Sequence, residues 1–204
     1  RGGGRWGFGH VPALDGLRGA AVAGVLAYHA GHLTGGYLGV DLFFVISGYL
    51  ITSLLLAEHR TTTTIALRRF WVRRARRLLP AVLLLLVGIA VYARVVARPV
   101  DLATIRGDGL ATLFYVANWR TILHGSSYWD ISLAPSPLQH TWSLAIEEQF
   151  YLVWPLVVVG LARVSRGRQP IDLAGRVLRT AVPLSLLSVA LFVGLHHAGA
   201  STTR

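Results

Sequence analysis

The sequence predicts an all-α fold, a polytopic bundle of about five transmembrane helices that is incomplete at the C-terminus. Of the 204 residues, 53% are hydrophobic and only 14% are charged, a balance too apolar for an ordinary soluble domain. The apolar residues gather into runs of about 20, the length that a helix needs to cross the hydrocarbon core. The 20 basic residues, all arginine, outnumber the 9 acids and fall mostly between these runs.

Five windows are apolar and long enough to span a bilayer. They are residues 11–30, 37–57, 78–97, 138–161 and 177–197. Residues 102–123 are amphipathic and broken by charged residues and glycines, so we expect an interfacial or partly buried helix there. Residues 1–10 are predicted to be a polar tail and 11–204 a membrane domain. The chain has no Met and stops just after an apolar run, so we expect it to be a fragment.

Arginine-rich segments predict the orientation in the membrane. Seven arginines and a single acid lie between the second and third windows, and five arginines follow the fourth window. Cytoplasmic loops are enriched in basic residues. We therefore expect a multi-pass protein of the cytoplasmic membrane with its N-terminus inside and residues 98–137 outside.

Composition also excludes several classes of function. The positive charge lies between apolar runs rather than on a soluble, patterned face, so nucleic acid is not an expected partner. The absence of Cys excludes disulfides, thiolate metal sites and a cysteine nucleophile.

Ionisable residues inside the apolar windows are candidate site residues because they are costly to bury in a membrane. Arg18 and His29 are eleven residues apart, close to three helical turns, so they lie on nearly one face with a rise of about 16 Å between them. His29 suits proton transfer near neutral pH, and Glu147 or Asp41 could support its charged form. His29 could deprotonate a substrate hydroxyl or act as a nucleophile itself, and we favour the first role.

Other polar residues leave alternatives open. Arg18 and the cluster at residues 73–77 suit a phosphate-bearing donor on the inner side. An arginine cluster beside a span more commonly reflects topology and contact with anionic lipid. His140 and Glu148 are equally well explained by hydrogen bonds to a neighbouring helix, and Ser47 by close helix packing rather than by a nucleophilic role.

Four sequence blocks resemble the acyltransferase-3 family of integral membrane O-acyltransferases. Residues 14–29 contain an Arg-x10-His motif, and residues 36–51 are similar to the family's second helix almost word for word. Residues 70–80 contain an Arg-x-x-Arg motif before a proline, and residues 138–152 contain a Trp-Ser-Leu-x-x-Glu block. Any one of these blocks is suggestive, but four in this order are specific.

The resemblance implies transfer of an acyl group, typically acetyl, from acyl-CoA to a hydroxyl of a cell-envelope carbohydrate or a glycosylated molecule. It implies that His29 is the essential catalytic residue and that Glu147 is its partner. Arg18, Arg74 and Arg77 would bind the donor or hold the site together. No metal and no bound cofactor are expected, because the thioester is already activated. Such domains usually have about ten spans, so residues 11–204 would be the N-terminal part of one.

Two other functional readings remain open at the sequence level. A transporter or acyl-exporting component could use the same intramembrane Arg, His and Glu as a polar path without making bonds. A truncated product could lack activity altogether. Acceptor-dependent release of CoA would separate an enzyme from a transporter.

Overall fold

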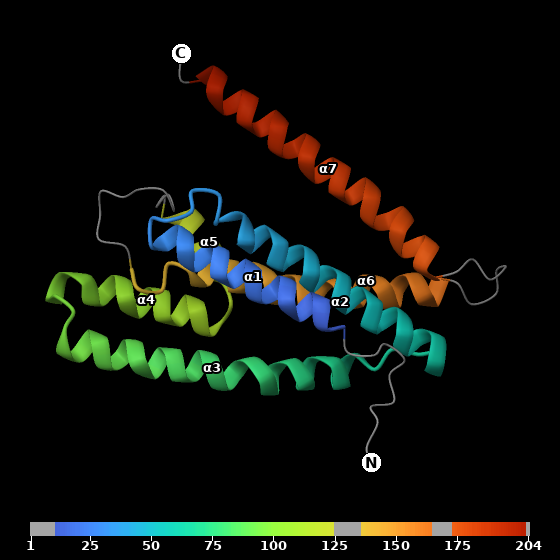
Figure 1. Ribbon diagram of the computed structural model, residues 1–204, viewed down its shortest axis with the longest axis horizontal. Helices are drawn as coiled ribbons and strands as arrows, with labels where there is room; N and C mark the ends of the chain where they lie inside the picture. The colour runs from blue at the N-terminus through green and yellow to red at the C-terminus, as the bar shows by residue number, and fades with distance from the viewer. Residues whose placement is uncertain (1–10, 125–135, 165–172, 203–204) are drawn as a thin grey trace. The chain divides into compact units, whose positions relative to one another are not determined.

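A computed structural model describes residues 11–124, 136–164 and 173–202, with only the backbone described for 196–202. These residues form helices and no strand, which confirms the predicted all-α class (Figure 1). The α-helices are α1 (Pro12–His29), α2 (Leu38–Thr62), α3 (Leu67–Val95), α4 (Leu102–Leu113), α5 (Ala117–Leu123), α6 (Thr141–Val164) and α7 (Leu173–Thr202), and a 3₁₀ turn (Pro99–Asp101) precedes α4.

The chain divides into two compact units, one ending at Pro155 and the other beginning at Leu156. The boundary lies inside α6, at a proline that removes one backbone hydrogen-bond donor from the helix. All the contacts that build the candidate site lie in the first unit.

Four helices of the described chain are long and apolar enough to cross a membrane: α2, α3, α6 and α7. They correspond to four of the five predicted windows and support a multi-pass membrane protein. The remaining window, 11–30, forms the 18-residue helix α1, which is outside this group. Its Asp15, Arg18 and His29 lower its mean hydropathy.

Two connections differ from the sequence prediction. The arginines from Arg68 to Arg77 were expected in a loop, but they lie on the first turns of α3. The left-handed backbone of Thr63 (φ 57°) ends α2, and the helix resumes four residues later, as the high helix propensity of arginine favours. Residues 102–123 form two short helices, α4 and α5, separated at Tyr115, whose φ is 54°.

Small residues let α1 and α2 pack as a tight antiparallel pair. A Cβ atom added at Gly36 would collide with the carbonyl oxygen of Gly24, and one added at Gly39 would collide with that of Ala21. Such close backbone approach is typical of helix contacts in membranes. It places the C-terminal end of α1, with His29, beside the start of α2.

Polar contacts along α6 hold it against α2, α3 and α5. The indole Nε1 of Trp154 donates to Thr52 Oγ1 on α2 at 2.9 Å. The side-chain amide of Gln149 donates to the carbonyl oxygen of Tyr115 at 2.8 Å and to Asn118 Oδ1 at 2.9 Å. These bonds satisfy polar groups that would otherwise be costly inside a membrane. They make α6 the helix around which the first unit is arranged.

Candidate active site

Glu147 lies on α6 where this helix faces α2. Its Oε1 accepts a hydrogen bond of 2.6 Å from Ser47 Oγ on α2 and a second one from the hydroxyl of Tyr151, one turn further along α6. Neither donor engages Oε2. The carboxylate is therefore held from two helices while one of its oxygens is not used by these donors.

Tyr151 connects this carboxylate to the arginines of α3. The guanidinium carbon of Arg74 lies 3.2 Å from the centroid of the Tyr151 ring, and an Arg74 nitrogen lies 3.6 Å from Glu148 Oε1. A cation over a desolvated aromatic face is worth about 0.5–2 kcal/mol. Trp71, one turn earlier on α3, donates its indole N–H to the Tyr151 carbonyl oxygen at 3.1 Å. Tyr151 is itself only 2% exposed.

His29 is the last residue of α1, and its ring is exposed. Its Nδ1 lies 2.8 Å from the carbonyl oxygen of Val25. A carbonyl oxygen can only accept, so Nδ1 carries the proton of the neutral ring and Nε2 presents a lone pair. This is the tautomer that a general base requires at Nε2.

A second histidine lies directly beside His29. The ring of His140, just before α6, meets the His29 ring edge to face with 4.7 Å between centroids. Burial, followed by the nearby charge of His29, lowers the pKa of His140 below its ordinary value. His140 therefore resists a second positive charge at this end of the helices.

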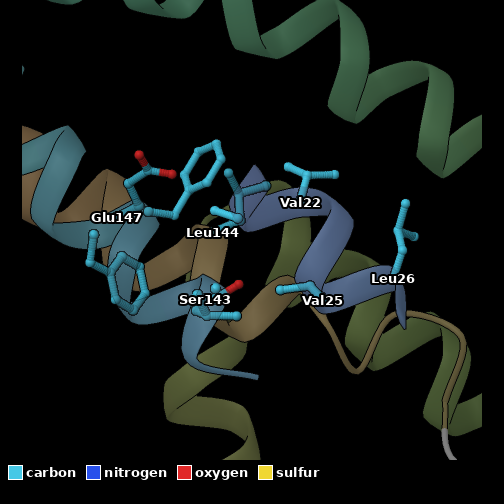
Figure 2. Close-up of a pocket in the computed structure, with 11 residues that line it drawn as sticks. Val22, Val25, Leu26, Ser143, Leu144 and Glu147 are labelled. Atoms are coloured by element: carbon cyan, nitrogen blue, oxygen red, sulfur yellow. The ribbon is translucent and has the colours of Figure 1, made fainter. Parts of the chain in front are cut away.

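An open groove of about 260 Å³ lies between α1, α2 and α6. Figure 2 shows Val22, Val25 and Leu26 from α1 and Ser143, Leu144 and Glu147 from α6 at this groove. Its walls are mainly apolar, and α2 completes them with one glycine and the side chains of a valine and two phenylalanines. The groove could therefore receive an apolar group beside the carboxylate of Glu147.

Two other predicted residues are connected to the groove through its lining. The carbonyl oxygen of Val25, a lining residue, holds His29. The guanidinium carbon of Arg18 lies 4.7 Å from the ring centroid of Phe43, another lining residue. The buried Nε of Arg18 has no hydrogen-bond partner among the described residues. Glu147 thus lines the groove itself, whereas His29 and Arg18 contact residues that line it.

The structure brings some predicted residues together and leaves others apart. Glu147 and Arg74 are joined through Tyr151. Asp41 lies in the first turn of α2 with its side chain exposed, and Arg77 is exposed on α3. The histidine ring contact is made by His140, whose role the sequence left open.

Sequence reasoning missed Tyr151 and Trp71 as parts of the site. The indole N–H of Trp71 donates to the backbone of α6, a contact that its position in the sequence does not reveal. Tyr151 lies four residues after Glu147, and residues with this spacing are neighbours on one helix face. Reading the face of α6 around Glu147 would therefore have identified the tyrosine.

Comparison with known proteins identifies the relatives of the chain. Residues 11–202 match the family described as Acyltransferase domain. The chain is 42% identical over 197 residues to the peptidoglycan O-acetyltransferase OatA of Listeria monocytogenes, covering 96% of this chain and 30% of that protein. It is 47% identical over 182 residues to the putative peptidoglycan O-acetyltransferase YrhL of Bacillus subtilis, covering 87% of this chain and 28% of the relative.

A third relative gives the same result. The chain is 44% identical over 189 residues to the O-acetyltransferase OatA of Staphylococcus aureus, covering 92% of this chain and 30% of that protein. The chain thus spans about 30% of the length of these relatives. No solved structure is significantly similar to it. The family match over nearly the whole chain, together with this degree of identity, shows that the chain belongs to the acyltransferase-3 family of membrane proteins.

Proposed function

We propose that the protein is a membrane O-acyltransferase that moves an acetyl group from acyl-CoA to a hydroxyl of a cell-wall carbohydrate, with peptidoglycan as the acceptor. The family membership and the names of the relatives support this proposal. The observation that carries it is one groove that Glu147 lines, with His29 and Arg18 in contact with two other lining residues, Val25 and Phe43. This arrangement supplies a carboxylate in a mainly apolar groove and a base and a cation on residues next to its lining.

In the proposed reaction, His29 is the general base. Its Nε2 takes the proton of the acceptor hydroxyl as the hydroxyl oxygen attacks the thioester carbonyl carbon. The C–S bond breaks as the C–O bond is completed, and the CoA thiolate takes the proton back from the imidazolium. Glu147 lines the groove that also includes Val25, whose carbonyl oxygen orients His29, and we assign it as the partner of His29.

The arginines are proposed to serve the donor and to stabilise the site. Arg18 has a buried Nε without a partner in the described chain, which suits an anionic or carbonyl group of the donor. Arg77 is exposed and suits a CoA phosphate. Arg74 is engaged with Tyr151 and Glu148, so it is assigned to stabilising the site. Asp41 has the same assignment, from the first turn of α2.

The orientation proposed for the protein follows from its arginines. The start of α3 is rich in arginine, whereas His29 lies at the turn between α1 and α2. Because cytoplasmic ends of spans are enriched in basic residues, the start of α3 would face the cytoplasm, where acyl-CoA is available. The N-terminus would then also be cytoplasmic, and the acceptor would approach from the other side.

Transfer of labelled acetyl from acetyl-CoA to a peptidoglycan fragment tests this function. The protein is expressed at the length that its gene encodes and is placed in nanodiscs. We expect acceptor-dependent CoA release, reduced about 100-fold or more in His29→Ala because a general base contributes at least that factor. His32→Ala, an exposed histidine in the following turn, is the matched control and should keep full activity. Acyl-CoA consumption without acetylated acceptor, or transport without CoA release, would contradict the proposal.

A further inference from the structure

Tyr151 is a buried polar residue at the junction of three helices. Its hydroxyl donates to Glu147 on its own helix α6, and its ring lies under Arg74 of α3. Ser47 of α2 donates to the same oxygen of Glu147. The chemistry proposed above assigns Tyr151 no contact with substrate, so its hydroxyl calls for another explanation.

We propose that Tyr151 is a positioning residue for acyl transfer, which sets the orientation of the Glu147 carboxylate from the position of α3. This inference rests on the proposed function and names a further residue on which it depends. Tyr151 and Ser47 together hold Oε1 of Glu147, so that Oε2 keeps one direction relative to the groove. Arg74 and Trp71 in turn hold the tyrosine.

The first argument is the geometry at the carboxylate. The terminal torsion of a glutamate has a broad, roughly two-fold preference, so one hydrogen bond leaves the plane of the carboxylate free to rotate. Two donors from different helices converge on Oε1, and one of them is a hydroxyl on the helix that carries Glu147 itself. The two bonds together restrict the rotation that either one alone would allow.

The second argument is the way in which α3 holds Tyr151. The guanidinium of Arg74 covers the ring, and the indole N–H of Trp71 binds the carbonyl oxygen of the same residue. Both contacts come from consecutive turns of α3, so the tyrosine cannot shift without breaking bonds to that helix. A shift of the arginine-bearing end of α3 would therefore move Tyr151 and, through its hydroxyl, change the orientation of the Glu147 carboxylate.

The third argument is the choice of tyrosine at a buried position. A phenylalanine would fill the same space and keep the cation over its ring. Burying a hydroxyl is costly unless it is hydrogen-bonded, and here its partner is Glu147. The hydroxyl therefore acts on Glu147, and its loss should affect the chemical step rather than binding of the donor.

Steady-state kinetics of acetyl transfer test this inference on the protein at the length its gene encodes, in nanodiscs with acetyl-CoA and a peptidoglycan fragment. We expect Tyr151→Phe to lower kcat about tenfold or more, as misplacement of a site group does, with the KM for acetyl-CoA nearly unchanged. In a Glu147→Gln background the same substitution should cause no further loss. Tyr49→Phe, an exposed tyrosine on α2, is the matched control and should retain full kcat.

Ser47→Ala provides a second variant, because Ser47 donates to the same oxygen. It should also lower kcat without changing the KM, and again not in the Glu147→Gln background. An unchanged kcat in Tyr151→Phe or in Ser47→Ala would overturn the inference, as would an equal loss with and without Glu147. In those cases the wild-type protein would still transfer acetyl groups, and the proposed function would be unaffected. Failure of the wild-type protein to acetylate any acceptor would instead overturn the proposed function together with this inference.

Discussion

Helices α2 and α3 are both long, apolar and able to span a membrane, yet they take different parts in the molecule. In the most apolar stretch of α2, 28% of the residues are buried, whereas in that of α3 only 6% are buried. Helix α2 packs between α1 and α6 and buries Ser47 and Leu55. Helix α3 contacts α6 through Trp71 and Arg74 near its start, while its later turns expose leucine and valine side chains.

The comparison shows that the apolar length needed to cross a membrane is not sufficient to build a functional site. Apolar length alone makes both helices candidate spans. The site is built where a span also carries small or polar residues that a second helix can approach, as Ser47 does with Glu147. In a bilayer, the exposed apolar turns of α3 would contact lipid chains that are equally apolar. Their side chains therefore need no packing partner within the chain.

The largest effect should come from the carboxylate at the contact of α2 with α6. Glu147→Gln keeps an acceptor oxygen for Ser47 and Tyr151 but removes the charge, so acetyl transfer should fall about 100-fold or more. Glu58, which is 4% exposed and accepts the backbone N–H of Ala66, is a glutamate of α2 away from the groove. Glu58→Gln should keep near-normal transfer in the same assay. Equal losses of acetyl transfer in Glu147→Gln and Glu58→Gln would show that the contact between α2 and α6 is not special for activity.

Next in size is the packing difference between the two helices. Leu55 on α2 is 0% exposed and Leu84 on α3 is 74% exposed. Leu55→Ala should lower the free energy of unfolding by about 2 kcal/mol or more, because it leaves a cavity. Leu84→Ala should change it by less than about 0.5 kcal/mol. SDS-induced unfolding in mixed micelles measures both, and a large effect at Leu84 would indicate that α3 has a packing partner.

Two arginines of α3 sharpen the comparison within one helix. Arg74→Ala breaks a partly buried pair with Glu148 and should lower the free energy of unfolding by about 1–2 kcal/mol. Arg77→Ala removes an exposed side chain and should leave stability nearly unchanged. If Arg77 binds a CoA phosphate, its loss should raise the KM for acetyl-CoA about tenfold. The reverse assignment, with the KM effect at Arg74 alone, would contradict the roles given to them.

The smallest expected effect is the contribution of His140, beside His29, to the pH dependence of stability. The pKa of His140 is lowered by burial and by His29, so the folded protein binds its proton less readily than the unfolded chain does. Its contribution to stability is therefore full above the ordinary histidine pKa and is lost as pH falls through that value towards the lower folded one. Unfolding measured between about pH 7 and pH 5 should show a shallower pH dependence in His140→Gln than in the wild-type protein. An unchanged dependence would show that His140 does not titrate in this way.

Much of this fold could be predicted from apolar windows, because crossing a bilayer requires a length that can be counted along the chain. Four windows became candidate spans, whereas α1 formed a helix with too many polar residues to join them. The arginines of α3 were misplaced into a loop, because charge favours a cytoplasmic position but does not stop a helix. Helix ends depend on local backbone geometry, such as that of Thr63, which the apolar pattern does not encode.

The candidate site was only partly predictable for a related reason. His29, Glu147 and Arg18 are conspicuous because ionisable groups are costly in apolar helices. Their partners are ordinary residues for such helices: Ser47 suits packing, and Tyr151 suits an interface. The packing of α1, α2 and α6 decides which side chain lies beside His29. In the structure that neighbour is His140.

The central claim is that His29 and Glu147, on different helices, act in one site. The most direct test is the rate of acetyl transfer in His29→Ala, Glu147→Gln and the double variant, each checked for folding. Groups that act as a unit are strongly non-additive, so the double variant should be about as slow as the slower single variant. Multiplication of the two losses, or full activity in either single variant, would contradict a shared site.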